Sequence, residues 1–360
     1  MRDRQLKSIV GCLLGTAVGD AMGLPYTRLS RKQIYQSHTP IVGHNFILNK
    51  GMISQDTEHT CMVAQSLIAS GGNTAKFSHY LAWRLRFWLI AFPPSASSTT
   101  LKSTLKLCLG SSPQTSGIDS IDNSAAVRSI IIGVCYGNEP SKLLSLVKAA
   151  TTITHNNPQA VLGAIAIAVA SYLAANEFLV APQDYYQTLQ KFLIDFDAAL
   201  SDKETTAFLS LIEQACLSAE GNEQGAIFAN RLANDKGISR SIDDTVAIVI
   251  QVWLRNQGSY SQSIKEIIYL GGDTNTTAAI VGGIVGASEG ITGIPKRWLD
   301  NIIDFPRSTN WIASLGKRLA QAQNTPQQSL PLASYLILPR NIIFWIAILF
   351  RAFYRLLPPY

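Results

Sequence analysis

Apolar residues recur at helical spacing through most of the chain, whereas strict alternation of apolar and polar residues is scarce. Long apolar or amphipathic stretches of this kind are Glu58–Ser70, Ser78–Ala91, Ala125–Cys135, Ser141–Ala150, Pro158–Ala175, Asp243–Arg255 and Ser261–Tyr269. A period near 3.6 residues indicates amphipathic or buried helices, whereas half-buried strands have a period of two. The pattern therefore predicts an all-α domain.

Two rows of small residues recur at every fourth position. They are Gly11, Gly15, Gly19 and Gly23 in the first row, and Ala278, Gly282, Gly286 and Gly290 in the second. On a helix this spacing places a whole row on one face, and glycine lets another backbone approach closely. We predict that both segments are close-packed core helices, and the first is a candidate partner for the second.

The N-terminus superficially resembles a secretory signal, because basic residues precede the apolar run Ile9–Gly19. A signal peptide has no use for glycine at every fourth position, so we interpret this run as the first core helix and expect a cytoplasmic protein. The five cysteines form no CxxC pair. This spacing is typical of small buried residues in a reducing compartment and argues against a zinc site.

Polar and proline-containing stretches divide the chain. We expect breaks between helices at Pro93-Pro94, Ser95–Thr104 and Ser111–Asp122, none of which resembles an inter-domain linker. The glutamine-rich residues 322–330 do resemble a connection. The expected organisation is a helical domain over residues 1–304, a connecting segment over 305–330 and a C-terminal tail over 331–360.

The net positive charge is concentrated in the last part of the chain. The sequence has 30 Lys and Arg against 24 Asp and Glu, a net charge of +6, and residues 305–360 hold six basic residues and no acidic one. Because no basic stripe interleaved with aromatics precedes residue 305, we expect no nucleic-acid partner. The apolar run Ile342–Phe350 is shorter than the ~20 residues of a bilayer span. Its arginines favour peripheral contact of residues 331–360 with an anionic membrane surface, ahead of simple docking on the body.

Two polar turns, each just before an expected helix, carry the candidate chemistry. The first is Ser54-Gln55-Asp56-Thr57, and the second is Gly271–Thr277, which contains Asp273, Asn275 and Thr276. Carboxylate, amide and hydroxyl oxygens are the ligands that Mg²⁺ prefers. The same residue types are routine helix N-caps. The turns by themselves support both interpretations about equally.

The second turn continues into a longer motif, Leu270-Gly271-Gly272-Asp273-Thr274-Asn275-Thr276-Thr277-Ala278-Ala279, which closely resembles the signature of the ADP-ribosylglycohydrolase family. Four more segments resemble family motifs in the family order: Gly11–Gly23, the first turn, Asn123-Ser124-Ala125-Ala126-Val127-Arg128 and Thr154-His155. The resemblance covers residues 8 to about 302, and the tail after residue 305 lies outside it.

The resemblance implies an all-α, orthogonally packed fold that uses Mg²⁺ to hydrolyse the bond between ADP-ribose and a protein side chain. The implied partner is ADP-ribose or an ADP-ribosylated protein. The implied metal ligands are Ser54, Gln55 and Asp56 in one cluster and Asp273, Asn275 and Thr276 in the other, with Asp56 and Asp273 also catalytic. The implied substrate-binding residues are Asn123, Ser124 and His155.

The chain departs from the family pattern at three carboxylates. Gln55 and Asn275 stand where the family usually has Asp, and Thr27 stands where many members have Glu. Two Mg²⁺ ions bring four positive charges, whereas Asp56 and Asp273 supply two negative ones, and close cation pairs need compensation. We predict weakened binding of one or two Mg²⁺ ions, of which at most one binds well, and hydrolysis that is much reduced or absent.

Three functions stay open at this point: an active hydrolase with an unusual ligand set, an impaired member that binds ADP-ribose or a modified protein, and a membrane-associated scaffold. Among the other carboxylates, we expect Asp20 near the pocket. We interpret Asp119 and Asp122 as solvated turn residues, and Asp243 or Asp244 as a helix cap.

Overall fold

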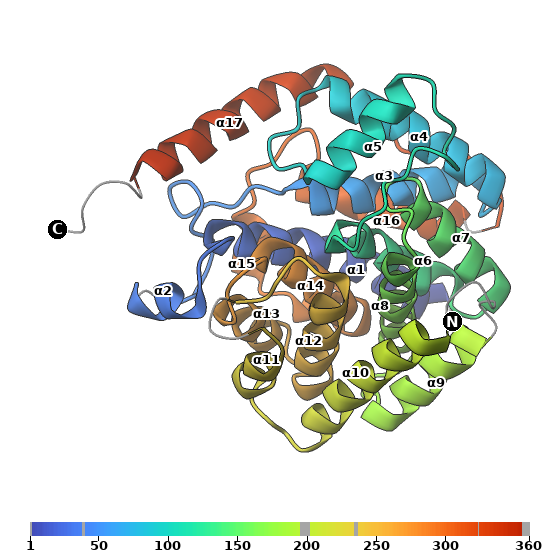
Figure 1. Ribbon diagram of the computed structural model, residues 1–360. Helices are drawn as coiled ribbons and strands as arrows, with labels where there is room; N and C mark the ends of the chain where they lie inside the picture. Colours follow the sequence, from blue (N-terminus) through green and yellow to red (C-terminus); the bar gives the residue numbers. More distant parts are fainter. Residues whose placement is uncertain (1, 38–39, 195–201, 234–236, 323, 355–360) are drawn as a thin grey trace.

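The computed structural model describes residues 2–37, 40–194, 202–233, 237–322 and 324–354 (Figure 1). Every regular element in these ranges is helical, and the only strand-like pairings there are isolated bridges. The first nine α-helices are α1 (Arg2–Gly23), α2 (Arg31–Gln36), α3 (Gln55–Ser70), α4 (Thr74–Ile90), α5 (Ser98–Cys108), α6 (Ser129–Tyr136), α7 (Pro140–Thr152), α8 (Pro158–Asn176) and α9 (Pro182–Ile194). The others are α10 (Asp202–Glu220), α11 (Gly225–Ala233), α12 (Ile242–Arg255), α13 (Tyr260–Tyr269), α14 (Thr274–Glu289), α15 (Lys296–Asp300), α16 (Thr309–Ala322) and α17 (Ile337–Tyr354). The all-α prediction is confirmed.

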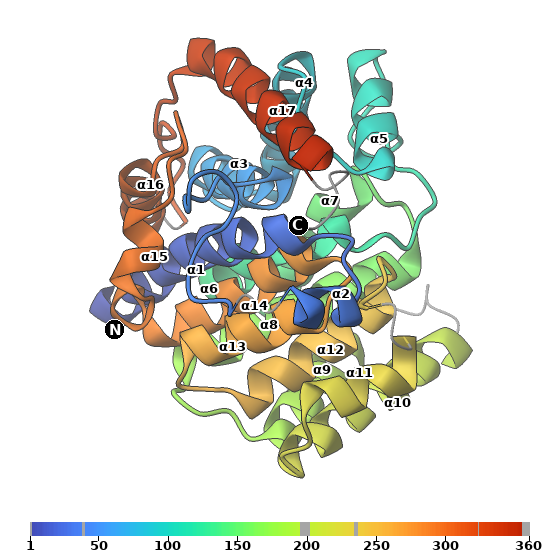
Figure 2. The same ribbon diagram turned by 90° about the vertical axis from the view of Figure 1, so that its left-hand side faces the viewer.

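Helices α1 and α14 run antiparallel at the centre of the molecule with their backbones in contact (Figures 1 and 2). A Cβ atom on Gly15 would lie 2.1 Å from the carbonyl oxygen of Gly282, and one on Gly19 would lie 2.0 Å from that of Ala278. No side chain fits at such a distance. Both small-residue rows therefore do what their spacing predicted, and they pack against each other.

The remaining helices form two groups around this pair. Helices α3, α4, α5 and α16 lie on one side, and α9 to α13 lie on the other (Figures 1 and 2). Helix α8 is buried along nearly its whole length and packs against α6, α12 and α14. Packing of this pair thus fixes the C-terminal end of α1 beside the N-terminal end of α14, between the two groups of helices.

One expected break is a helix. Ser95–Thr104 was predicted to interrupt the fold, but Ser98–Cys108 forms α5. Ser97 caps this helix, because its hydroxyl accepts a hydrogen bond from the amide of Thr100. The serine and threonine side chains of its first turns are buried, so tertiary packing outweighs their preference for turns. Helices α9, α10, α11 and α16 also lie where no helix was predicted.

Three described segments are long and apolar enough to cross a membrane by length and composition: Asp3–Tyr26, Pro158–Asn176 and Ser334–Phe353. The protein itself buries 94% of the first segment's most apolar window, 83% of the second's and 28% of the third's. The first segment contains α1, which confirms the prediction of a core helix. The third contains α17, the outermost helix along the upper edge of Figure 1.

The residues before α17 lie against the helical body. Gln65 of α3 donates a hydrogen bond of 3.0 Å to the carbonyl of Leu330. The indole of Trp311 on α16 donates one of 2.9 Å to the carbonyl of Pro331. The segment expected to connect the domain to its tail, residues 305–330, thus contains helix α16, and the residues around position 330 contact α3 and α16.

Candidate functional site

A cavity of about 640 Å³ opens where the end of α1 meets the start of α14. Thr27 lies on its wall just after α1, and Asp273 and Asn275 lie there at the start of α14. The loops at residues 94–96 and 238–240 and one side of α17 complete the wall. Its volume is within the ~300–1,000 Å³ of pockets for drug-sized ligands. We call this cavity the α1–α14 pocket.

The charged residues that line the α1–α14 pocket are mostly arginines. Among the described residues they are Arg28, Arg240 and Arg351, with Asp273 as the one carboxylate. The guanidinium of Arg351 donates hydrogen bonds to the backbone carbonyls of Asn45 and Pro25. The pocket therefore has a basic wall, although the residues before 305 have no net charge.

The first polar turn is held from behind by Asp20 on α1. Its Oδ2 atom accepts hydrogen bonds from the Ser54 amide at 2.7 Å and from the Thr57 hydroxyl at 2.6 Å. Burial raises the pKa of Asp20 to about 6, although these hydrogen bonds oppose the shift. Asp20 thus lies beside the turn, as expected, and fixes the start of α3, where Ser54 is the N-cap.

The two turns meet at Asp56. Its Oδ2 atom accepts hydrogen bonds from the Asn275 side-chain amide at 2.8 Å and from the Thr276 hydroxyl at 3.0 Å. The carbonyl oxygen of the Asn275 side chain accepts from the Thr27 hydroxyl at 2.9 Å, which fixes the amide with its nitrogen toward Asp56. Neutral donors thus surround this carboxylate oxygen.

The ionisation of Asp56 is disfavoured by its surroundings. Burial raises its pKa well above the ordinary value, and the carboxylates of Asp20 and Asp273 add to the rise. Its second oxygen, Oδ1, is buried without a hydrogen-bond partner in the part of the chain that the structure describes. Asp56 is 1% exposed and is not among the described residues that line the α1–α14 pocket, so this oxygen is an unpaired acceptor in the interior.

Gln55 does not join the cluster. Its side-chain oxygen accepts a hydrogen bond of 3.1 Å from the backbone amide of Ser97, and its backbone amide donates one of 3.0 Å to the Ser95 hydroxyl. The side chain therefore holds the loop before α5 instead of pointing toward Asp56. Of the six residues implied as metal ligands, Ser54, Asp56, Asn275 and Thr276 are brought together, whereas Gln55 is turned away.

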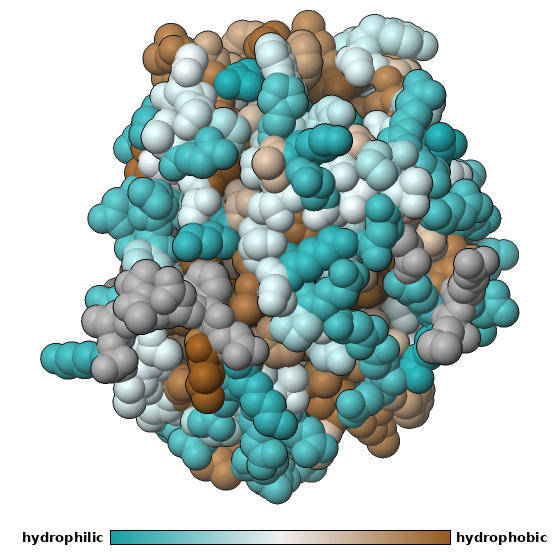
Figure 3. Space-filling view, turned by 90° about the vertical axis from the view of Figure 1, so that its right-hand side faces the viewer, coloured by the Kyte–Doolittle hydropathy of each residue, from teal (hydrophilic) through white to brown (hydrophobic). Residues whose placement is uncertain are grey.

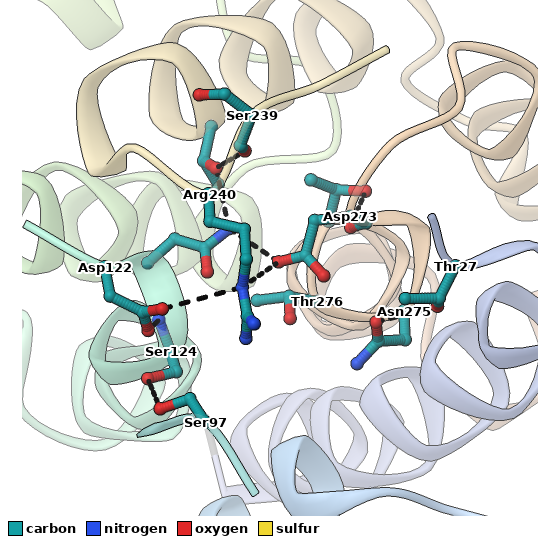
Figure 4. A network of polar contacts seen from close by, with 12 residues as sticks. Thr27, Ser97, Asp122, Ser124, Ser239, Arg240, Asp273, Asn275 and Thr276 are labelled. Carbon is teal, nitrogen blue, oxygen red and sulfur yellow. Dashed lines mark hydrogen bonds and ion pairs between the residues drawn. The ribbon is translucent and has the colours of Figure 1, made fainter. Parts of the chain in front are cut away.

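Asp273 lies next to a guanidinium that no sequence motif marks (Figure 4). Its Oδ2 atom accepts a hydrogen bond of 2.9 Å from the Asn123 amide and lies 3.8 Å from Nε of Arg240. The same nitrogen lies 3.5 Å from Oδ2 of Asp122. Burial raises the pKa of Asp273, although the charge of Arg240 opposes the shift. Arg240 therefore supplies the positive charge between these two carboxylates.

Asp122 was interpreted as a solvated turn residue, and this is wrong. Its side chain is only 15% exposed, and it caps the 3₁₀ helix η2 (Asn123–Arg128) by accepting a hydrogen bond of 3.0 Å from the Ser124 amide. Burial raises its pKa, but hydrogen bonds from His155 and Ser124 and the charge of Arg240 outweigh burial and hold the pKa at about 2.

Asn123, Ser124 and His155 are buried beneath the α1–α14 pocket and are not among the described residues that line it. Nε2 of His155 lies 3.3 Å from the Ser124 hydroxyl and 3.5 Å from Oδ1 of Asp122. Burial lowers the pKa of His155, which favours the neutral ring. In this arrangement these three residues support Asp122 and Asp273 from behind.

The donor set does not fit a pair of Mg²⁺ ions. Within the described residues, no group of three or more His, Cys, Asp or Glu side chains could hold a metal ion. Asn275 and Thr276 direct N–H and O–H groups toward Asp56, and neither can also offer its lone pairs in that direction. The buried Oδ1 atom of Asp56 gives a single cation one carboxylate ligand.

The fold and its converging turns define a helical domain with a polar pocket between the ends of two central helices. The chain belongs to the ADP-ribosylglycohydrolase family, whose model matches residues 1–329. The resemblance inferred from the sequence motifs is thereby confirmed, and α17 lies outside the matched residues.

Several relatives cover most of the chain. An uncharacterized protein of Archaeoglobus fulgidus is 27% identical over 301 residues, 81% of this chain and 90% of that protein. The ADP-ribosyl-[dinitrogen reductase] glycohydrolase of Rhodospirillum rubrum is 22% identical over 302 residues, 81% of this chain and 89% of that protein. The uncharacterized protein YegU of Escherichia coli is 26% identical over 333 residues, 85% of this chain and 96% of that protein.

A solved structure shares the fold. A chain of an ADP-ribosylglycohydrolase-related protein complex superposes with a TM-score of 0.66 at 20% identity, covering 89% of this chain and 99% of that one. The helical architecture is therefore that of the family.

Proposed function

We propose that this protein binds ADP-ribose, or the ADP-ribosyl group of a modified protein, in the α1–α14 pocket and cleaves the glycosidic bond weakly or not at all. Membership of the family supports the ligand class. The observation that carries the proposal is the charge of the wall, on which Arg28 and the half-exposed Arg240 lie. Arg351 adds positive charge there, although its guanidinium is bonded to backbone carbonyls. Guanidinium groups bind phosphate oxygens through paired hydrogen bonds, which suits the diphosphate of ADP-ribose.

Weak cleavage is supported by the surroundings of Asp56. Its Oδ2 atom accepts from two neutral donors, and Gln55 is turned toward the loop before α5. Nearby cations that share ligands need several carboxylates to offset their charge. With Asp56 and Asp273 as the only carboxylates among the implied ligands, a second divalent cation would lack this compensation.

A Mg²⁺-dependent ADP-ribosyl hydrolase is the second candidate, and one observation favours it. The Oδ1 atom of Asp56 is buried without a partner among the described residues, and a bound cation would satisfy it. Asp56 would then hold one Mg²⁺, with Ser54 as a nearby oxygen ligand. The cytoplasmic location and the absence of a nucleic-acid partner stay predictions from the sequence.

Calorimetric titration with ADP-ribose tests the binding proposal. We expect saturable heat with ADP-ribose and weaker binding of AMP and of ribose 5-phosphate, because each lacks part of the diphosphate ligand. Circular dichroism of the same sample establishes that the protein is folded. A folded sample that shows no heat of binding up to about 1 mM ADP-ribose would contradict the proposal. A dissociation constant at that limit corresponds to only about 4 kcal/mol of binding free energy.

A further inference from the structure

Helix α17 turns its polar side chains toward the protein. Arg340 is 1% exposed, and its guanidinium donates hydrogen bonds to Asp304 at 2.6 and 3.2 Å and one to the carbonyl of Ile53. The amide of Asn341 donates a hydrogen bond of 2.7 Å to the carbonyl of Ala91. The inner side of the helix is therefore fixed to the body by charged and polar contacts.

The outer side of α17 is apolar throughout. In the described stretch 341–353, every exposed residue is apolar: Ile342, Ile343, Trp345, Ile346, Leu349, Phe350, Ala352 and Phe353. The inner side is partly apolar as well, because Phe344 is buried against Phe46 and Met52. Helix α17 is therefore apolar on its solvent side in addition to its core side, whereas an ordinary surface helix is polar toward solvent. These exposed residues lie along one side of α17, a helix of 18 residues that is about 27 Å long.

The apolar surface continues onto the neighbouring end of α4. Phe87, Ile90 and Phe92 are exposed there. Trp345 connects the two parts, because its indole donates a hydrogen bond of 3.2 Å to the carbonyl of Phe92. We call the exposed apolar residues of α17 together with these three the outer face. Figure 3 shows apolar residues along its upper edge, the edge at which α4, α5 and α17 lie in Figure 1.

We propose that the outer face docks on a lipid bilayer, with α17 lying in the plane of the membrane–water interface. A protein partner forms about one hydrogen bond per 100–200 Å² of interface, and the described α17 residues of this face offer it no polar side chain except the indole of Trp345, which is already bonded. Hydrocarbon requires no such groups, and an apolar helix side inserted at the acyl boundary satisfies this surface.

Spanning the membrane is disfavoured by the inner side of α17. Arg340 also lies 3.8 Å from Glu58, in addition to its pairing with Asp304. Withdrawing the helix into a bilayer would leave the buried Asp304 without that charge, which is strongly destabilising, whereas Glu58 would keep its ion pair with Arg307. The helix therefore docks through its outer side while its inner side stays attached to the body.

Apolar burial provides most of the attraction to the bilayer. Arg307 and Arg340 are buried, and Arg351 is bonded to backbone carbonyls. Three of the six basic residues after position 305 are thus used within the fold. The anionic surface that the sequence favoured is not required, and binding to a neutral bilayer is expected.

Four residues of α17 also line the α1–α14 pocket: Ile348 and Arg351, together with Trp345 and Ala352 at the border of the outer face. Docking of the outer face consequently places the pocket beside the membrane surface. The docking proposal stands on the outer face alone and does not depend on which ligand the pocket binds.

Co-sedimentation with vesicles tests the proposal on the full chain. Vesicles of phosphatidylcholine alone and with added phosphatidylserine are compared at 0.1 and about 0.5 M salt, where charge attraction is screened. The variant Ile346→Glu/Phe350→Glu changes two side chains that are 62% and 71% exposed. The matched control is Phe178→Glu/Leu179→Glu, at 65% and 63% exposure and away from the outer face. A truncation that deletes α17 is unsuitable as a test, because it also removes the buried ion pair between Arg340 and Asp304.

The proposal predicts that the wild-type chain and the control variant bind neutral vesicles at both salt concentrations. The outer-face variant is expected to bind at least about tenfold more weakly, because two apolar groups are lost from the bilayer. Alkaline carbonate should release the bound protein. Four results would overturn the proposal: no vesicle binding, a requirement for anionic lipid that salt removes, resistance to carbonate, or a self-association that the outer-face variant abolishes without any lipid binding.

Discussion

Arg240 places a guanidinium between Asp122 and Asp273 on the wall of the pocket, and its side chain is about half exposed. It therefore balances charge within the site and can also reach a ligand. The two polar turns were predictable, because each is contiguous in sequence and precedes a helix. The position of Arg240 was not predictable, because the two carboxylates that it lies between, Asp122 and Asp273, come from distant segments of the chain. The direction of Gln55 likewise depends on a loop about 40 residues further along.

Replacing Arg240 by glutamine should weaken ADP-ribose binding about tenfold, since one charge-assisted contact with a phosphate contributes about 1.4 kcal/mol. Calorimetry measures this change. Arg297→Gln, an exposed arginine on α15 that does not line the pocket, is the control and should bind like the wild type. Equal affinities of the Arg240 variant and the control would show that Arg240 does not contact the ligand.

His59 makes stability depend on pH. It is buried in edge-to-face contact with Trp88, with ring centroids 4.6 Å apart. Burial lowers its pKa well below 6.5, and the charges of Arg128 and Arg307 add to the effect. The unfolded chain therefore binds a proton more readily, so the contribution of neutral His59 is complete above pH 6.5 and is lost as the pH falls.

The variant His59→Phe keeps the contact with Trp88 and removes this titration. Its melting temperature should fall less between pH 7 and pH 5 than that of the wild type. Asp20, whose pKa is raised to about 6, acts in the opposite direction, because its contribution is lost as the pH rises. It affects both proteins equally, so the difference between their melting curves reports His59. Parallel pH dependences would refute this role.

At the scale of elements, the position of the site follows from the contact between α1 and α14. The two rows of small residues were visible in the sequence, and their spacing predicted helices with close-packed faces. The helices α9, α10 and α11 were not predicted, because their short or amphipathic stretches are less distinct than the buried runs. Helix α5 was missed because its serines and threonines resemble a loop until the packing around them is known.

The substitution Gly15→Ala should destabilise the protein by about 3 kcal/mol or more, because the new Cβ would overlap the carbonyl oxygen of Gly282 at 2.1 Å. Gly43→Ala is the matched control, since its Cβ would meet only the Trp298 indole nitrogen, at 4.0 Å. Thermal unfolding of both variants measures the effect. A Gly15 variant as stable as the control would mean that the two helices are not in backbone contact.

At the scale of the whole molecule, a family scaffold carries a pocket in which Gln55 and Asn275 stand among the implied metal ligands, and an apolar helix lies outside the matched residues. The family and the fold could be predicted from motifs, because they depend on local sequence. The docking of α17 through Arg340 could not, because Asp304 and Ile53 are brought together only in the folded chain.

Restoring the missing carboxylates should restore metal binding. In the triple variant Thr27→Glu/Gln55→Asp/Asn275→Asp, the hydrogen bond from Asn275 to Asp56 becomes a repulsion, which should lower the stability without metal by about 3 kcal/mol. Added Mg²⁺ should then stabilise the variant by about 2.7 kcal/mol at a concentration 100 times its dissociation constant. The wild type provides the comparison. If Mg²⁺ does not change the melting temperature of the variant, the absence of these three carboxylates is not the reason for weak metal binding by the wild type.

The most direct test measures release of free ADP-ribose from ADP-ribosyl-arginine and ADP-ribosyl-serine peptides, with Mg²⁺ and with a chelator. For folded wild-type protein that binds ADP-ribose in the calorimeter, the account predicts little or no release and no difference between the two conditions. Release at an ordinary enzymatic rate of about 1 s⁻¹ or more, dependent on Mg²⁺ and abolished by Asp273→Ala, would contradict it and establish a working hydrolase.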